Sequence, residues 1–480
     1  MPNLFYPYTM PALAVKKKKN NKSLFKRISA WLHLWLGIGS GLIVMIVGLT
    51  GCMYVFEHEI KDFMEDWRFV EPQQKAFMLP SELVRIADQK MNGPHASSVT
   101  FSGRDEAAIV GYFIPKKDKK ASRDAAMGKR SPATELNQAA ATKPDLRLNA
   151  KRKAGGKGEA PRKRREGIFR SVYMNPYTGA ILHVKSTSRT ESPDFFRFML
   201  NGHRALWLPY EIGRPIVGVG VLVFVVLLIT GIVLWWPAKW IKSMRDKSFK
   251  IKWDASFKRI NYDMHNVLGF YSMIFLLMIS MTGLVWSFQW WSKSVYWVTS
   301  GGKSLVDTRE TPLSDTTSLK PFNITNVDKI WFKLRKENAQ AASIMLSIPQ
   351  KPAESISASV YQQSNTFYNM DRFNYDQQSL KELKSKSPFA GKYIEANLPD
   401  KIRRMNYDIH VGAVLGLTGK IIAFFASLIC ASLPVTGFLI WWGKKKKSKK
   451  PAALTKAVVT TDPPLKKLRV VKKEEEPVYS

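Results

Sequence analysis

Four long apolar runs divide this chain of 480 residues, and they constrain its fold more than any other feature. Each run is long enough to cross a hydrocarbon core of about 30 Å as a helix that rises about 1.5 Å per residue. Runs of this length are typical of membrane-spanning helices. The sequence therefore predicts a membrane protein with four transmembrane helices, over residues 29–57, 213–237, 263–291 and 417–442.

Basic residues account for the formal net charge of +36, and their positions indicate membrane topology rather than nucleic-acid binding. No nucleic-acid motif accompanies the charge. The clusters lie beside the apolar runs, at Lys16 to Lys19, in the loop 238–262 and in the tract 444–450. Because cytoplasmic loops of membrane proteins are enriched in Lys and Arg, we expect both termini and this loop to be cytoplasmic. The first run is too long for a cleavable signal, so we expect it to remain as a membrane helix.

These assignments divide the chain into a regular order of segments. We expect the two long segments on the side of the membrane opposite the termini, since each follows an odd number of spans. The basic insert in the first of them does not change this, because long loops are translocated largely regardless of their charge. The expected order is a basic N-terminus 1–28, transmembrane helix 29–57, first outer domain 58–200, transmembrane helix 201–237, cytoplasmic loop 238–262, transmembrane helix 263–291, second outer domain 292–405, transmembrane helix 406–442 and a basic cytoplasmic tail 443–480.

Each outer segment carries the pattern of a small α+β domain. Turn dipeptides, Asn-Pro and Thr-Gly, separate alternating apolar stretches within 170–184, which predicts a strand, a turn and a second strand. The first segment also predicts a helix over 80–91 and strands over 97–102 and 107–114, and the second predicts a helix over 325–337 and strands near 342–347, 355–361 and 366–373. The basic insert 116–165 has little apolar surface to bury, so we expect it to be disordered.

The chain repeats the order helix, outer domain, helix, and motifs inside the helices repeat with it. The first helix reads HLWLGIGSGLIVMIVGLTG from His33 and the third reads HNVLGFYSMIFLLMISMTG from His265, so a Thr-Gly pair begins 17 residues after each histidine. After His203 and His410 a Thr-Gly pair follows at 27 and 26 residues, and both helices then end in two tryptophans. We interpret this pattern as an internal duplication.

The four histidines of these motifs predict two ligand pairs. By the expected topology, His33 and His265 lie toward the inner face, whereas His203 and His410 lie toward the outer face. A polar side chain at membrane depth is costly unless it has a partner. Neutral imidazole is a good axial ligand of haem iron, and facing helices can supply one nitrogen each. The sequence therefore predicts two b-type haems, one held by each pair, that carry electrons across the bilayer.

Other interpretations of these residues stay open. A histidine near the interface is often a hydrogen-bonded anchor, and a histidine pair could also bind Zn or Cu, although no cysteine or carboxylate ligand is close in the sequence. Cys52 and Cys430 lie within apolar runs, where a lone cysteine usually packs as a small core residue. The Gly37 to Gly41 spacing is typical of helix packing.

An ordered set of short motifs extends from Ser29 to Trp442. It comprises WLHLWLG (31–37), GLTG (48–51), NPYTG (175–179), HRALWLP (203–209), TGIVLWWP (230–237), MHNVLGF (264–270), MTGLVWSF (281–288), IHVGAVLG (409–416) and TGFLIWW (436–442). In these motifs the chain resembles the PepSY-associated transmembrane proteins, also called iron-regulated or iron-uptake membrane proteins. It departs from them in the insert 116–165, and in FNYDQQSLKEL (373–383), where the family usually shows an Asp/Asn-x-x-x-Gly turn.

The resemblance implies a four-helix bundle in the bacterial inner membrane with two PepSY-like extracytoplasmic domains. In members that act as siderophore-iron reductases it also implies two haems, whose ligands would be His33, His203, His265 and His410. Such members pass electrons outward to a ferric siderophore or other ferric chelate and release Fe(II) for uptake. We therefore expect an oxidoreductase supplied by a cytoplasmic flavin, flavoprotein or quinol.

A second class of function stays open. PepSY domains are associated with inhibiting or regulating peptidases, so the chain could instead be a non-enzymatic, membrane-tethered regulator of peptidases or of iron transport with structural histidines. A transporter of iron or siderophore is a third class, but four helices without paired intramembrane carboxylates make a poor ion path.

Overall fold

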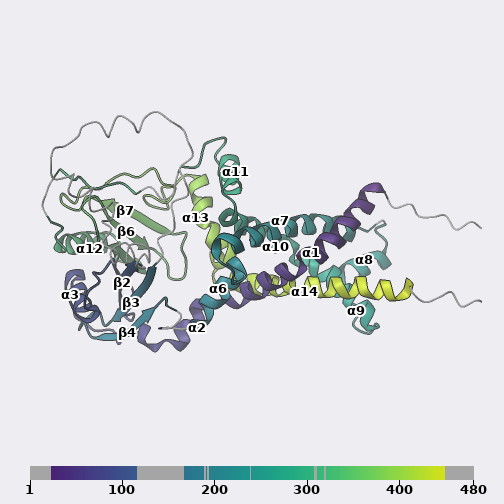
Figure 1. The fold of residues 1–480 in the computed structure, drawn as a ribbon, viewed down its shortest axis with the longest axis horizontal. Helices are drawn as coiled ribbons and strands as arrows, with labels where there is room; N and C mark the ends of the chain where they lie inside the picture. Colours follow the sequence, from purple (N-terminus) through teal and green to yellow (C-terminus); the bar gives the residue numbers. More distant parts are fainter. Residues whose placement is uncertain are drawn as a thin grey trace, which may run out of the picture.

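The fold is that of a computed structural model, which describes residues 23–115, 167–188, 191, 194–237, 239–306, 311–317 and 321–448. The basic insert 116–165 and the N-terminal lysines lie outside these residues. Figure 1 shows two parts that follow one another along the long axis, one built around a β-sheet and one a bundle of long helices. We call them the sheet domain and the bundle.

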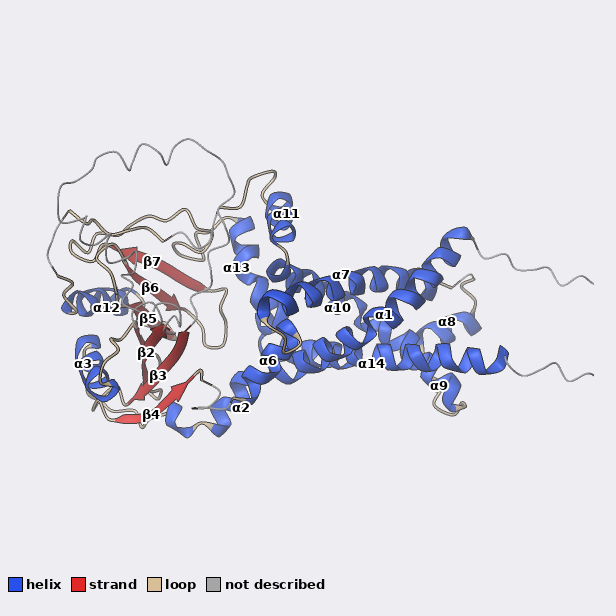
Figure 2. Ribbon diagram, viewed as in Figure 1, coloured by secondary structure: helices blue, strands red, loops and turns tan. Residues whose placement is uncertain are grey.

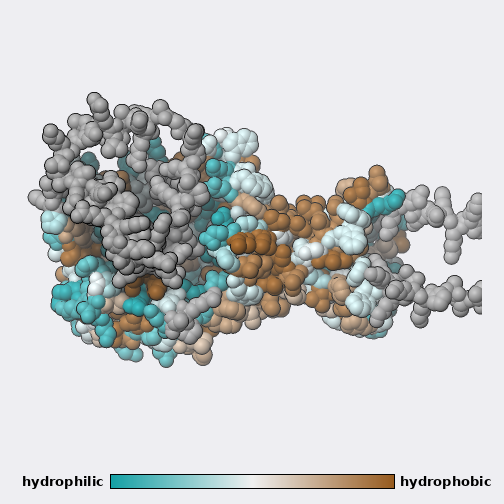
Figure 3. Space-filling model, in the orientation of Figure 1, coloured by the Kyte–Doolittle hydropathy of each residue, from teal (hydrophilic) through white to brown (hydrophobic). Residues whose placement is uncertain are grey.

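The bundle contains the helices that are long and apolar enough to cross a membrane, and there are four of them among the described residues. They are α1 (Leu24–Tyr54), α7 (Tyr210–Trp235), the stretch Phe257–Ser287 and α14 (Gly416–Ser448). Phe257–Ser287 comprises α9 (Phe257–Asp263), a π-helical turn (Met264–Leu268) and α10 (Gly269–Ser287). Figure 3 shows the belt of apolar side chains on this part of the molecule. The four predicted spans are confirmed, with ends that differ by a few residues.

The bundle is held together by apolar contacts between helices that are neighbours in space. Helix α1 packs against α7 and α14, and α10 packs against the same two helices. The side chains buried between them are mostly aliphatic, and they form one cluster: Val44, Phe224, Leu227, Leu228, Leu276, Ala426 and Cys430. Cys430 is therefore a core residue, as its position in an apolar run predicts.

Two short helices precede α7 and α14, and they correct the predicted boundaries of two membrane helices. The segments 201–237 and 406–442, each expected to be one transmembrane helix, contain a break, and the shorter spans 213–237 and 417–442 begin after it. Helix α6 (Phe195–Ala205) ends at Leu206 in the left-handed region (φ 52°), and Pro209, which has no N–H to donate, then precedes α7. Helix α13 (Leu398–Val411) ends at Gly412 (φ 80°), because glycine adopts this conformation without strain, and a 3-10 turn (Ala413–Leu415) leads into α14.

The sheet domain is a single antiparallel sheet of seven strands in the order β4-β3-β2-β1-β5-β6-β7 (Figure 2). The strands are β1 (Ser98–Phe101), β2 (Ala108–Pro115), β3 (Gly167–Met174), β4 (Ile181–Ser186), β5 (Ser343–Ser347), β6 (Ile356–Tyr361) and β7 (Met370–Tyr375). The helices α3 (Pro80–Met91) and α12 (Thr325–Glu337) pack against each other and against the sheet. The α+β content predicted for both long segments is therefore present.

The two long segments are not separate units, however, and the sequence did not reveal this. Strand β1 of the first segment pairs with β5 of the second, with Val99 opposite Leu346. Residues of both segments also share one buried core, which includes Leu83, Val110, Leu334 and Ile344. Pairing satisfies the N–H and C=O groups that two separate sheets would each leave exposed at an edge strand.

The remaining short helices lie near the junction of the two parts or at the far end of the bundle (Figure 1). Near the junction are α2 (Glu57–Met64), a 3-10 turn (Asp66–Arg68) and α11 (Gln289–Thr299), together with α6 and α13. At the far end lie α8 (Lys242–Phe249) and α9.

Candidate functional site

The four predicted histidines form two pairs in space. The ring centroids of His33 and His265 are 6.3 Å apart, and those of His203 and His410 are 6.0 Å apart. We call the first the distal pair and the second the sheet-side pair, because α6 and α13, which carry it, lie beside the sheet domain (Figure 1). These are the two pairs that the sequence predicts, and their role as metal ligands remains a prediction.

Each imidazole ring packs against the Thr-Gly pair of another helix, which gives that repeated dipeptide a structural role. A Cβ atom on Gly231 would lie 3.4 Å from Cε1 of His33, and one on Gly437 would lie 3.2 Å from Cε1 of His265. In the sheet-side pair, the corresponding distances are 3.0 Å from Gly51 to His203 and 3.3 Å from Gly283 to His410. Glycine at these positions lets the ring approach the helix backbone closely.

Hydrogen bonds determine which ring nitrogen each distal histidine leaves free. Nδ1 of His33 lies 3.0 Å from Oγ1 of Thr230, and Nδ1 of His265 lies 2.9 Å from Oγ1 of Thr436. Each threonine hydroxyl donates its one proton to a carbonyl of its own helix. The threonine oxygen must therefore accept from Nδ1–H, which leaves Nε2 with a lone pair for a metal.

The sheet-side pair has the same arrangement. Nδ1 of His203 lies 2.9 Å from the carbonyl oxygen of Val47, which can only accept, so Nδ1 carries the proton. Nδ1 of His410 lies 3.0 Å from the Ile279 carbonyl and 3.0 Å from Oγ1 of Thr282. Nε2 is thus the nitrogen available for a metal on all four histidines.

Two asparagines, which the sequence analysis missed, hold the third and fourth histidine helices in place. Nδ2 of Asn261 donates to the carbonyl of Thr436 at 3.1 Å, and Nδ2 of Asn406 donates to the carbonyl of Thr282 at 3.2 Å. Each asparagine stands four residues before its histidine and bonds to the threonine that also contacts that histidine.

A sequence signal for these asparagines exists. The heptapeptides RINYDMH (259–265) and RMNYDIH (404–410) share five of seven residues and both end in a predicted ligand. A second signal, FKRI, begins eight residues before His33 and eight before His265. Both signals, the shared heptapeptide and FKRI, lie upstream of the histidines, whereas the Thr-Gly pairs lie downstream.

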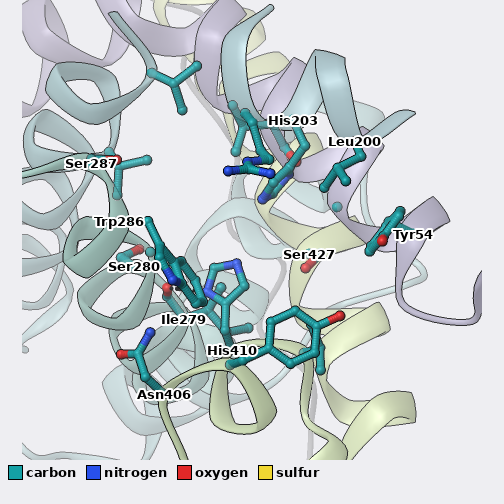
Figure 4. Close-up of a pocket in the computed structure, with 18 of the residues that line it drawn as sticks. Tyr54, Leu200, His203, Ile279, Ser280, Trp286, Ser287, Asn406, His410 and Ser427 are labelled. Carbon is teal, nitrogen blue, oxygen red and sulfur yellow. Dashed lines mark hydrogen bonds between the residues drawn. The ribbon is translucent and has the colours of Figure 1, made fainter. Parts of the chain in front are cut away.

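A cavity of about 590 Å³ opens beside the sheet-side pair. Figure 4 shows His203 and His410 projecting into it from two different helices, with Trp286 and Tyr54 at its walls. The Trp286 ring centroid lies 5.1 Å from that of His410. The volume is in the range of about 300–1,000 Å³ that is common for cofactor and ligand sites.

Each site offers two histidines, which fits a metal whose other ligands come from a cofactor. Among the described residues no group of three or more His, Cys, Asp or Glu side chains could hold a bare metal ion. Zinc needs at least three protein ligands, whereas haem iron takes four nitrogens from its macrocycle and only axial ligands from the protein. Two imidazoles that bind one metal, each at about 2 Å, have centroids roughly 6 Å apart, as both pairs do.

The other histidines lie away from both pairs. His58 and His95 pair with Asp62 and Asp88, and His183 stacks on Trp67. Among the described residues, no glycine of a Thr-Gly pair contacts their rings as in the two pairs above.

A comparison with known protein families gives a match over most of the chain. The sequence model for the PepSY-associated TM region matches residues 30–444. No curated protein matches the chain.

Proposed function

The chain belongs to the family of the PepSY-associated TM region, and from this premise we propose that it is a di-haem electron-transfer protein of the bacterial inner membrane. It would reduce ferric siderophores on the periplasmic side and so release Fe(II) for uptake. The observation that carries the proposal is that four histidines form two pairs with centroid separations of 6.3 and 6.0 Å, each with Nε2 left free.

Haem bound by two imidazoles supplies reversible one-electron transfer between Fe(III) and Fe(II). His33 and His265 would hold one haem, and His203 and His410 would hold the other. The protein's own contribution is to orient the ligands: the glycines allow each ring to lie against a helix, and the Nδ1–H bonds hold its tautomer and rotation.

We further propose that the sheet domain is periplasmic and that both termini are cytoplasmic. Basic residues support this orientation: the far end of the bundle carries α8, α9 and their connecting loop, which include Lys242, Lys247, Lys250 and Lys258. The start of α1 and the end of α14 lie at the same end (Figure 1). A cytoplasmic flavin, flavoprotein or quinol would therefore meet the distal pair, and a ferric complex would meet the sheet-side pair.

We also propose that the two halves of the chain arose by duplication. The Thr-Gly contacts with the histidines support this, since each half supplies two of them. The turns of the sheet domain support it as well. The side chain of Asn175 accepts from the N–H groups two and three residues on, and the side chain of Asp376 does the same.

The experiment is a reduced-minus-oxidised visible spectrum of the protein purified after haem-replete expression. We expect b-type bands and about two haems per chain. Replacing either His33 or His265 by alanine should remove the same haem, replacing His203 or His410 should remove the other, and the exposed His95→Ala should remove neither. Absence of b-type bands from the wild-type protein would refute the proposal and favour the non-enzymatic regulator.

A further inference from the structure

The cavity beside the sheet-side pair is lined by basic residues and by no acidic ones. Among the described residues that form its wall there are five arginines and neither aspartate nor glutamate. The arginines come from several elements of the chain: Arg204, Arg214, Arg372, Arg403 and Arg404. Arg404 is occupied, because its guanidinium donates to the carbonyls of Pro388 and Ala390. Arg214 donates from Nη2 to the carbonyl of Ser287, and Arg204 donates from Nη2 to the hydroxyl of Tyr210. None of the five forms an ion pair with any residue that the structure describes.

Two of these arginines have buried donor atoms without a partner. Nε of Arg214 and Nε of Arg403 are both buried and make no hydrogen bond. A buried N–H of a cation that makes no hydrogen bond is costly, since it has lost its hydration without replacement. Both residues line the cavity, so an acceptor bound there would lie beside these donors.

Two of these arginines lie close to each other, and a third lies on the helix that carries His410. Arg403 stands seven residues before His410 on α13, so both side chains lie on the same face, about 10 Å apart along the helix axis. The guanidinium groups of Arg204 and Arg214 lie 5.4 and 5.8 Å from the ring centroid of Tyr210. One aromatic ring thus holds two like charges close together.

We infer that Arg204, Arg214 and Arg403 form a carboxylate-binding site within the cavity, about two helical turns from His410 on the sheet-domain side. Arginine suits this task because its planar guanidinium donates two parallel hydrogen bonds to one carboxylate. Two partly buried guanidinium groups with free Nε–H, drawn from α7 and α13, can hold two carboxylates or both ends of one polyanion.

Two kinds of molecule could supply the carboxylates. One is the pair of propionates of a haem held by His203 and His410; this source rests on the proposed function. The other is an anionic polycarboxylate chelate of a trivalent metal, and its binding does not need haem. Both use the same contacts, so the experiment separates them.

The test compares the full-length wild type with Arg403→Gln and Arg214→Gln. Haem retention is measured as the rate of haem loss to an excess of a haem-scavenging apoprotein. Chelate binding is measured by calorimetry with Ga³⁺ citrate, which is redox-inactive. Arg85→Gln, an exposed residue of α3, is the matched control for the loss of one positive charge. Arg403→Lys keeps the charge without the planar fork and should recover part of the binding.

If propionates are the source, each Gln variant should lose the sheet-side haem about tenfold faster or more, with Ga³⁺ citrate binding absent or unchanged. If a chelate is the source, Ga³⁺ citrate should bind wild type and bind each variant about tenfold more weakly, with haem retention unchanged. Unchanged retention and unchanged citrate binding in both folded variants would overturn the inference. A wild type that lacks haem but binds Ga³⁺ citrate through these arginines would refute only the proposed function.

Discussion

Gly51 leaves the space that the imidazole of His203 occupies: a Cβ atom on Gly51 would lie 3.0 Å from Cε1 and 3.2 Å from Nδ1 of that ring. The Gly51→Val substitution should therefore push the ring away from α1 and reduce haem content by about one haem per chain, measured by pyridine haemochrome absorbance. Gly39→Val is the control on the same helix, since a Cβ atom there meets nothing within 4 Å. Equal haem loss in both variants would contradict the prediction.

The hydrogen bond of the Thr230 hydroxyl, rather than the volume of the Thr230 side chain, should determine how tightly the distal pair retains haem. Thr230→Val keeps the shape but removes the oxygen that accepts from Nδ1–H of His33 at 3.0 Å. Loss of such an outer contact typically lowers metal affinity by about 10–100-fold, so we expect faster loss of one haem. Thr50→Val is the control, because the Thr50 hydroxyl donates to Ile46 and forms no bond with His203.

Lys420 and Glu59 form an ion pair. Removing only the lysine should destabilise the protein more than removing both charges. Lys420 Nζ lies 2.6 Å from Glu59 Oε1, with the lysine side chain 8% and the glutamate side chain 35% exposed. Lys420→Met should lower the free energy of unfolding by about 1–3 kcal/mol, since it leaves a partly buried carboxylate unpaired. The double variant Glu59→Gln, Lys420→Met should recover much of this loss. Thermal unfolding in detergent measures both, and a double variant less stable than the single one would contradict this account.

Asp376 should make the sheet domain sensitive to acid. Burial alone would raise the pKa of this carboxyl, but N–H donors, chiefly from Ser379 and Asp315, outweigh burial and lower the pKa to about 2. A depressed pKa means that the carboxylate stabilises the fold above its unfolded pKa of about 3.9 and ceases to do so as pH falls toward 2.

The Asp376→Asn variant should be less stable near neutral pH and should lose less stability between about pH 4 and pH 2. The midpoint of thermal unfolding measured against pH tests this. Asn175 occupies the corresponding position in the first turn, so Asn175→Asp should add acid sensitivity of the same sign. Parallel pH profiles for wild type and Asp376→Asn would refute the prediction.

The turn at 376–380 has the same geometry as the turn at 175–179, although its sequence departs from the Asp/Asn-x-x-x-Gly pattern. Its fifth residue is Leu380, with φ 59°, where the turn at 175–179 has Gly179, with φ 72°. The amide of each donates to the carbonyl of the first residue of its turn, at 3.0 and 2.9 Å. The geometry is thus kept without glycine, because the hydrogen bonds to Asp376 offset the strain of a left-handed leucine.

Much of the fold could be predicted, since it follows from local patterns. Apolar length alone located the four helices that could span a membrane, and apolar stretches separated by turn dipeptides located β3 and β4. The breaks before α7 and α14 were missed, because Pro209 and Gly412 stand beside apolar residues that continue the pattern on both sides. The pairing of β1 with β5 has no local signature at all, since it joins residues more than two hundred positions apart.

The sequence by itself determined which residues repeat: one histidine near or just before the start of each membrane span and one Thr-Gly pair within the span. Tertiary structure decided which of them meet. Along one helix, Thr50 and Gly51 lie about 25 Å from His33, too far for contact. Antiparallel packing brings His33 to Thr230 and Gly231, and Gly51 to His203. The spacing within each helix therefore matters only because neighbouring helices run in opposite directions, so that the Thr-Gly pair of each helix lies at the depth of a neighbouring helix's histidine.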